Sequence, residues 1–233
     1  MRHVLAATLC ALAAQAVAEE APLAEMPVVV ELYTSQGCSS CPPADALLKQ
    51  LADMDGVIPL SLHVDYWDYI GWPDGFAKAA HSARQEAYAR AAGEHMVYTP
   101  QMIVNGTDRV LGGDALAVME RLQAHSGALT PVRLELSRKG GELAIEARAE
   151  AALPPLLVQL VRYRPEATVA IEGGENAGHT LDYANVVTDW QVVGEWSGEG
   201  PLALTVPLPG DEPAVVILQE EGPGPIRAAA RLP

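Results

Sequence analysis

Two cysteines separated by two serines are the residues of this sequence best suited to chemistry. The motif Cys38-Ser39-Ser40-Cys41 comes just after an apolar, strand-like run and at the start of an expected helix. The N-terminus of a helix offers unpaired N–H groups and the positive end of the helix dipole, and both favour a thiolate over a thiol. We therefore expect Cys38 to be the exposed nucleophile, and Cys41, one turn further along, to be shielded and to resolve a mixed disulfide.

The same pair allows other interpretations. A zinc site needs four ligands, and the sequence contains neither a second cysteine pair nor a histidine at a supporting spacing. A structural disulfide, in a binding module without enzymatic activity, would close a loop too small to gain much entropy. A copper carrier could combine the cysteines with a distal residue among His63, His95 and Met96. The function we expect is thiol–disulfide exchange with protein or small-molecule thiols and disulfides, in either direction, with no cofactor and no resident metal.

Charge and composition restrict the remaining classes of function. The chain has 233 residues, with 30 Asp and Glu against 15 Lys and Arg, and a formal charge of −15 at pH 7. Such an acidic surface repels phosphate backbones, so nucleic-acid partners are not expected. Hydrophobic residues make up 49% of the chain, which is enough to build a buried core in one large or two small domains.

The N-terminus has the pattern of an export signal. A short basic start precedes an uncharged apolar run, and Ala16-Val17-Ala18 is a small-x-small cleavage site. The apolar run of about 11 residues is shorter than the roughly 20 that span a bilayer. We expect residues 1–18 to be a signal peptide, removed from a periplasmic or secreted protein without a membrane span, and residues 19–27 to be a flexible arm. The mature chain would keep only two cysteines, in an oxidising compartment.

Alternating strands and helices are predicted in residues 28–127. The segment opens with a strand–helix–strand unit, whose strands should be parallel with a right-handed crossover. Asn105-Gly106 between two apolar runs is a strong signal for a β-hairpin, and Asp114 is a suitable N-cap for the helix after it. The expected elements are a strand at 28–34, a helix at 38–55, a strand at 57–64, a helix at 76–93, hairpin strands at 102–104 and 109–111, and a helix at 115–125.

A β-rich second domain is predicted in residues 128–233. Short stretches of alternating apolar and polar residues, separated by Gly and Pro, are typical of an antiparallel sandwich or sheet. Strands are expected at 131–138, 142–149, 156–163, 186–193, 202–206, 214–219 and 226–230. The glycine-rich segment 173–178 is interpreted as an acidic loop, because it joins no clear strand to a helix as a phosphate-binding loop does.

Several segments of the sequence resemble one bacterial family. They are VELYTSQGCSSCPPAD at 30–45, DYWD at 65–68, RQ at 84–85 and YTPQ at 98–101. On these segments the chain is similar to the secreted family filed as domain of unknown function 1223, which implies a thioredoxin-like fold over residues 28–126 and no settled activity. The expected fold class is an α/β thioredoxin-like domain with a helical insertion, followed by a mostly antiparallel β domain. Thioredoxins have Gly-Pro where this chain has Ser39-Ser40, so their redox potential is not carried over.

Thr99, Pro100 and Glu31 enter the candidate site through this resemblance. In thioredoxin-like folds a cis proline at this place packs beside the reactive pair, so we expect a cis Thr99-Pro100 bond, with the Thr99 backbone facing Cys38 and able to pair with a substrate peptide. Thioredoxins also carry a buried acid on the first strand of the unit, which Glu31 resembles. A buried carboxyl has a raised pKa and can carry protons. A Glu31 that faces outward, or pairs with an arginine such as Arg84, would have no such role.

Overall fold

The computed structural model of the protein describes residues 24–232. The signal peptide predicted at residues 1–18 therefore lies outside the described residues. Near the end of the expected arm, Ala24–Glu25 (β1) pairs antiparallel with Leu129–Thr130 (β6), so this part of the arm is held against the start of the second half. Each helix within residues 24–232 is too short or too polar to cross a lipid bilayer.

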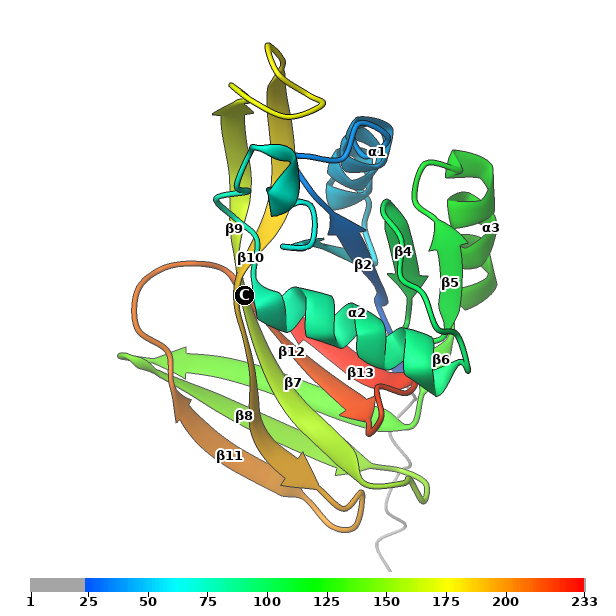
Figure 1. Cartoon of the computed structure of the whole chain (residues 1–233). Helices are drawn as coiled ribbons and strands as arrows, with labels where there is room; N and C mark the ends of the chain where they lie inside the picture. The colour runs from blue at the N-terminus through cyan, green and yellow to red at the C-terminus, as the bar shows by residue number, and fades with distance from the viewer. Residues whose placement is uncertain (1–23, 233) are drawn as a thin grey trace, which may run out of the picture.

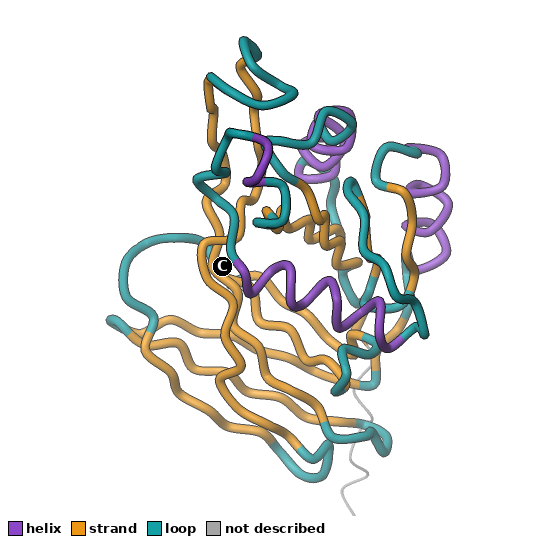
Figure 2. Tube along the Cα trace, in the orientation of Figure 1, coloured by secondary structure: helices purple, strands orange, loops and turns teal. Residues whose placement is uncertain are grey.

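The fold is a mixed α/β arrangement around one large sheet (Figure 1). Eight strands form this sheet in the order β13-β12-β9-β10-β3-β2-β4-β5, and three form a smaller sheet in the order β11-β8-β7. Figure 2 shows helices beside one half of the molecule only. The helices are α1 (Pro42–Ala52), α2 (Ala79–Ala91), α3 (Ala115–His125) and the short 3-10 helix η1 (Asp68–Ile70). The other strands are β2 (Val28–Thr34), β3 (Val57–His63), β4 (Gln101–Val104), β5 (Asp108–Leu111), β7 (Val132–Lys139), β8 (Glu142–Ala149), β9 (Leu156–Ala170), β10 (Thr180–Trp196), β11 (Leu202–Pro207), β12 (Ala214–Glu220) and β13 (Ile226–Arg231).

The predicted strand–helix–strand unit is confirmed. β2 and β3 pair in parallel along their whole length, and every residue of both strands is buried. Successive side chains of a strand point to opposite faces of the sheet. Val28, Val30 and Leu32 therefore pack under α1 and α3, whereas Val29 and Tyr33 pack on the face that α2 covers.

The predicted hairpin is confirmed as well, and it positions Pro100. Three residues, 105–107, connect the paired Val104 and Asp108, and Asn105 and Gly106 among them have φ angles of 47° and 72°, left-handed values that Asn and Gly tolerate. β4 pairs antiparallel with β2, and its first residue, Gln101, lies opposite Tyr33. Pro100 therefore lies at the edge of the sheet where β2 ends and the chain turns toward α1.

Strand β10 joins the two halves of the chain. It pairs in parallel with β3 through Val186 and Ser61, and antiparallel with β9 along most of its length. Four strands of the segment expected as a β-rich domain thus extend the sheet that begins in residues 28–127. β9 and β10 are also longer than predicted, because their outer ends pair with each other as far as Ala170 and Thr180.

Within residues 24–232, three hydrophobic clusters make up the core. One lies under α1 and α3, and a second lies between the small sheet and the long strands. The third combines Leu60 and Leu62 of the first half with Val161, Val187 and Val215 of the second, so both halves share it.

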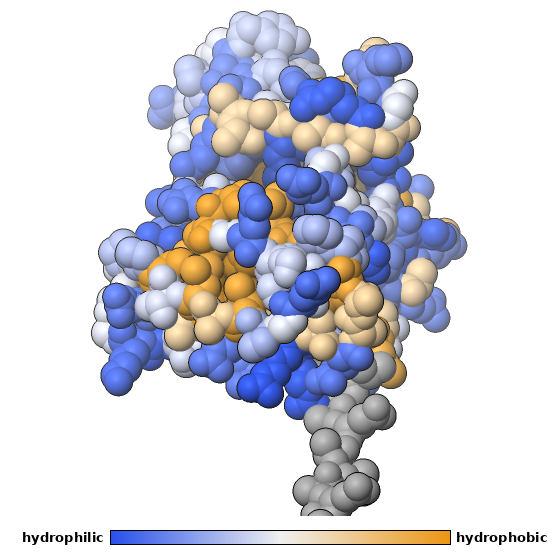
Figure 3. Space-filling model, turned by 90° about the horizontal axis from the view of Figure 1, so that it is seen from below, coloured by the Kyte–Doolittle hydropathy of each residue, from blue (hydrophilic) through white to orange (hydrophobic). Residues whose placement is uncertain are grey.

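Viewed from below, the surface shows a patch of apolar residues surrounded by hydrophilic ones (Figure 3).

Candidate functional site

The two cysteines form a disulfide in the loop between β2 and α1. The helix begins later than predicted, at Pro42, and Cys41 is its N-cap, while Cys38 lies in the turn before it. Two prolines at the first helical positions explain this start, because their missing N–H groups would have no partner inside the helix. Cys41 is nevertheless continuous with the helix, since its carbonyl accepts hydrogen bonds from Ala44 N at 2.9 Å and Asp45 N at 3.1 Å.

The expectation that Cys38 would be exposed is wrong. Both cysteines are 0% exposed, and only the serines between them reach the surface. The reason is the loop at the tip of the β9–β10 hairpin, residues 171–179, which lies over the turn. Asn176 Nδ2 donates to Gln36 O at 2.8 Å and to Cys38 O at 3.0 Å, and Glu175 Oε2 accepts from Ser39 N at 3.4 Å. We call this segment the covering loop.

The aromatic-rich loop at 65–75 forms a second wall beside the disulfide. Trp72 Nε1 donates to Gln36 Oε1 at 2.8 Å. Ile70 fills the space next to Gly37, where an added Cβ would lie 2.8 Å from Ile70 Cδ1, and one at Gly174 of the covering loop would lie 3.1 Å from the same atom. The two loops therefore pack closely around the turn because both positions lack a side chain.

Thr99-Pro100 is cis, as predicted, and it lies beside the first turn of α1. A Cβ built at Gly112 would be 3.1 Å from Pro100 Cβ and 3.3 Å from Ala44 Cβ, so a single small residue separates the proline from the helix that carries the pair. The Thr99 hydroxyl accepts a hydrogen bond from Trp67 Nε1 at 2.7 Å. The side chain of Thr99 is thereby tied to the aromatic-rich loop.

Glu31 is buried, but on the face of the sheet opposite α1. Its carboxylate accepts hydrogen bonds from Arg84 Nε at 2.7 Å and Arg84 Nη2 at 2.8 Å, from Tyr33 OH at 2.8 Å and from Tyr88 OH at 2.7 Å. Sequence analysis left two roles open for Glu31, a proton carrier or a partner of an arginine such as Arg84. The structure shows the pairing with Arg84. Burial and the charge of Glu31 raise the pKa of the Tyr88 hydroxyl well above its ordinary value.

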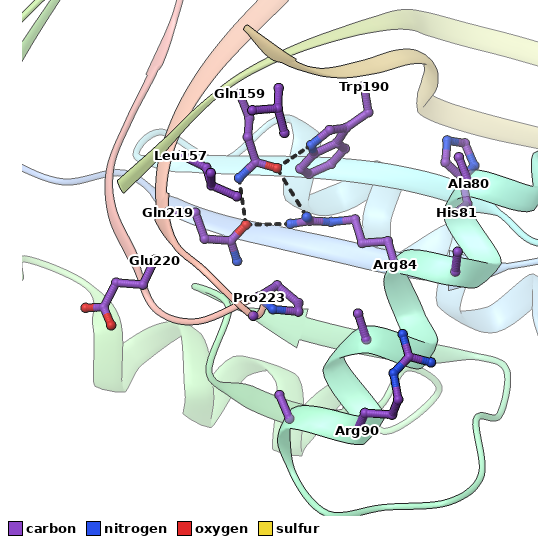
Figure 4. A pocket seen from close by; sticks show the side chains of 15 residues that line it. Ala80, His81, Arg84, Arg90, Leu157, Gln159, Trp190, Gln219, Glu220 and Pro223 are labelled. Carbon is purple, nitrogen blue, oxygen red and sulfur yellow. Dashed lines mark hydrogen bonds between the residues drawn. The ribbon is translucent and has the colours of Figure 1, made fainter. Parts of the chain in front are cut away.

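A polar network in the second half completes the surroundings of Arg84 (Figure 4). Its guanidinium also donates to Gln219 Oε1 at 2.9 Å and to Gln159 Oε1 at 3.3 Å, and it stacks 3.9 Å above the ring of Trp190. These residues line a pocket of about 750 Å³ between α2 and the sheet. Sequence analysis missed them, because Gln159, Gln219 and Trp190 belong to three different strands. Nothing in the sequence around each of them indicates that all three contact Arg84.

A second buried polar cluster lies under the N-terminus of α1, and sequence analysis missed it too. Asp45 is 4% exposed, and neither of its carboxylate oxygens has a hydrogen-bond partner of normal geometry among residues 24–232. Burial raises the pKa of Asp45 to about 7, and nearby Asp74 raises it further, while the charge of His63 and the Thr34 hydroxyl oppose the rise. His63 Nδ1 lies 2.7 Å from Asp74 Oδ2. Burial alone would raise the pKa of Asp74, but the hydrogen bond from His63 and the charge of His63 outweigh it and lower this pKa.

The residues considered for copper do not come together. His63 is 0% exposed and paired with Asp74, whereas Met96 is 81% exposed in the loop before Thr99, next to the exposed His95. In the part of the chain that the structure describes, no group of three or more His, Cys, Asp or Glu side chains has an arrangement that could hold a metal ion.

Comparison with known proteins gives a family and a fold. A family model described as Protein of unknown function (DUF1223) matches residues 29–219. The crystal structure of a protein from Agrobacterium tumefaciens is similar, with 35% sequence identity and a TM-score of 0.77, over 91% of this chain and 96% of that chain. HBP35 of Porphyromonas gingivalis shares the fold, with 16% identity and a TM-score of 0.64, over 89% of this chain and 74% of that chain. No curated protein matches the sequence.

Proposed function

The chain belongs to the DUF1223 family of proteins of unknown function, and we propose that it is an exported thiol–disulfide oxidoreductase with a thioredoxin-like first half. The observation that carries the proposal is the disulfide between Cys38 and Cys41 at the start of α1, in the loop of a parallel strand–helix–strand unit. A loop this small contributes little as a structural staple, whereas two cysteines so placed suit dithiol exchange.

The order of elements supports the thioredoxin-like assignment. The unit β2-α1-β3 is followed by the hairpin β4-β5 and by α3, and α1 and α3 cover the same face of the sheet. In this proposal η1 and α2 form the helical insertion between the unit and the hairpin, and Pro100 flanks the reactive turn.

The exchange would run through a mixed disulfide. In the reduced protein the Cys38 thiolate attacks a disulfide of a client protein, so that a bond forms between Cys38 and one client sulfur and the other leaves as a thiolate. Cys41 then attacks Cys38 Sγ, the client sulfur leaves, and the client has gained two electrons. The reverse sequence oxidises a client dithiol. Ser40 Oγ lies 3.4 Å from Cys38 Sγ, close enough to donate to the thiolate.

Access to Cys38 requires the covering loop to move. While Asn176 donates to Gln36 O and Cys38 O, the sulfur has no exposed surface. A client that displaces Asn176 would find two backbone acceptors beside the sulfur, and a peptide backbone can donate to both. Protein clients would thus gain backbone contacts that small thiols lack.

Redox titration with glutathione tests the proposal. The oxidised protein is equilibrated in glutathione and dithiothreitol buffers of graded potential, and its free thiols are counted by alkylation and mass spectrometry. We expect a reversible two-electron transition, with Cys41→Ser accumulating a mixed disulfide with glutathione and Cys38→Ser accumulating far less. The exposed Ser39→Ala variant serves as a control and should behave as wild type. A folded protein that forms no mixed disulfide in the Cys41→Ser variant would contradict the proposal.

A further inference from the structure

Unpaired polar atoms gather beneath the N-terminus of α1. Both carboxylate oxygens of Asp45, the Thr34 hydroxyl, Nε2 of His63 and the Tyr183 hydroxyl are buried and have no hydrogen-bond partner of normal geometry among the described residues. Buried polar groups are normally satisfied, and a cluster of exceptions needs an explanation. These atoms come from three strands and one helix, so the cluster is built by the central elements of the fold.

The helix places Asp45 next to Cys41. The Asp45 N–H donates to the Cys41 carbonyl at 3.1 Å, so the two residues are one α-helical turn apart. Side chains four positions apart lie on the same face of a helix, and each leans back toward the N-terminus. The Asp45 carboxyl therefore lies on the buried side of α1 and leans toward the turn that holds the disulfide.

Glu31 is unsuited to carrying a proton for this pair. Four hydrogen bonds from Arg84, Tyr33 and Tyr88 occupy its carboxylate, and α2 covers its face of the sheet, whereas α1 lies on the other face. Asp45 differs on both counts, because its carboxylate oxygens have no hydrogen-bond partner of normal geometry among the described residues and because it belongs to α1 itself.

We propose that Asp45 exchanges a proton with Cys41 during disulfide exchange, an inference that rests on the oxidoreductase function proposed above. When Cys41 attacks the mixed disulfide, its S–H proton passes to the Asp45 carboxylate as the new bond to Cys38 Sγ forms and the client sulfur leaves with its electron pair. In the opposite direction, a client thiolate attacks Cys38, and the departing Cys41 sulfur takes the proton back from Asp45.

The electrostatic surroundings suit both directions. A pKa of about 7 lets the Asp45 carboxyl accept a proton or donate one near neutral pH. The titratable groups facing Asp45 are His63 on β3, Asp74 on the aromatic-rich loop and Tyr183 on β10. Tyr183 stays neutral in this range, because burial, Asp45 and Asp74 all raise its pKa.

Single-turnover kinetics test the inference with Asp45→Asn, which keeps the shape of the side chain and removes its titration. The matched control is Asp53→Asn, an exposed carboxylate at the other end of the same helix. The protein is loaded with glutathione on Cys38, and closure of the disulfide by Cys41 is followed from pH 5 to pH 9. We expect Asp45→Asn to close about ten-fold more slowly at pH 7 and to approach wild type at pH 9, where the thiol ionises unaided.

The first chemical step separates this inference from the function on which it rests. Attack by Cys38, measured in a Cys41→Ser background, should be unchanged by Asp45→Asn. Closure at the wild-type rate across the pH range would overturn the role of Asp45 while leaving the oxidoreductase function intact. Failure of the wild type to form any mixed disulfide would overturn both. If Asp45→Asn does not fold, NMR titration of the wild-type Asp45 carboxyl decides, because identical titrations in the oxidised and reduced protein would contradict the inference.

Discussion

Replacing Asp45 with Asn should change how the stability of the oxidised protein depends on pH. The pKa of the Asp45 carboxyl is about 7 in the folded protein against an ordinary value of 3.8, so the folded state holds the proton more tightly than the unfolded state. Below about pH 4 the carboxyl is protonated in both states. Between about pH 4 and 7 the unfolded state loses the proton first, so the free energy of unfolding falls as the pH rises.

The size of this loss follows from the two pKa values. They differ by roughly three pH units, and each unit corresponds to about 1.4 kcal/mol, so ionised Asp45 costs about 4 kcal/mol above pH 7. Asn does not titrate and avoids this cost. The free energy of unfolding of Asp45→Asn relative to wild type should therefore rise by about 4 kcal/mol between pH 4 and pH 8.

Urea denaturation of the oxidised protein measures this difference, with the disulfide kept intact so that the cysteines do not titrate. The packing cost of the amide is the same at every pH and therefore cancels in the comparison, as do the other titrating groups. Asp53→Asn should give a difference that is flat with pH. A flat difference for Asp45→Asn as well would refute the reasoning, since it would mean that the carboxylate of Asp45 is solvated or paired in solution.

Two further predictions concern the covering loop and the buried ion pair. Asn176→Ala removes both hydrogen bonds that this side chain donates over the disulfide, so Cys38 of the reduced protein should react with iodoacetamide several-fold faster than in wild type, and an unchanged rate would contradict its role as a cover. Arg84→Met leaves the buried Glu31 carboxylate without a cationic partner, although Tyr33 and Tyr88 still donate to it, and should lower the free energy of unfolding in urea by about 3–5 kcal/mol. The control Arg90→Ala, in an exposed pair on the same helix, should change it by about 0.5 kcal/mol or less. A small effect of Arg84→Met would show that water reaches Glu31.

Elements with strong local patterns could be predicted from the sequence. Residues 28–34 form an apolar, β-branched run that only a strand covered on both faces accommodates, and β2 has that setting. Asn105-Gly106 fixes a hairpin turn through backbone angles that few other residues accept. In these cases the residues that decide the structure are neighbours in the chain.

The parts that could not be predicted depend on contacts between distant residues. The burial of Cys38 depends on Asn176, which lies 138 residues away along the chain. Residues 180–185 of β10 were not predicted as part of a strand, and they pair with the equally unpredicted end of β9. Asp45 is the last residue of the segment 30–45 that resembles the family. Its burial was not predicted, because an acid in the first turn of a helix is commonly solvated and interacts with the helix dipole. Asp45 is buried because α1 packs against β3 and β10, and the pattern of the helix itself does not reveal this packing.

The core that both halves share has a consequence for the order in which the chain is made. Synthesis proceeds from the N-terminus, so β2 and β3 are made before Val161, Val187 and Val215. These three valines pack in one core cluster with the side chains of β2 and β3 that face α2. Until β9, β10 and β12 follow, Leu60 and Leu62 lack part of their cover, and β3 has an unpaired edge. Such intermediates are prone to aggregate. The turn that holds the disulfide is therefore expected to gain its cover only after the covering loop at 171–179 has been synthesised.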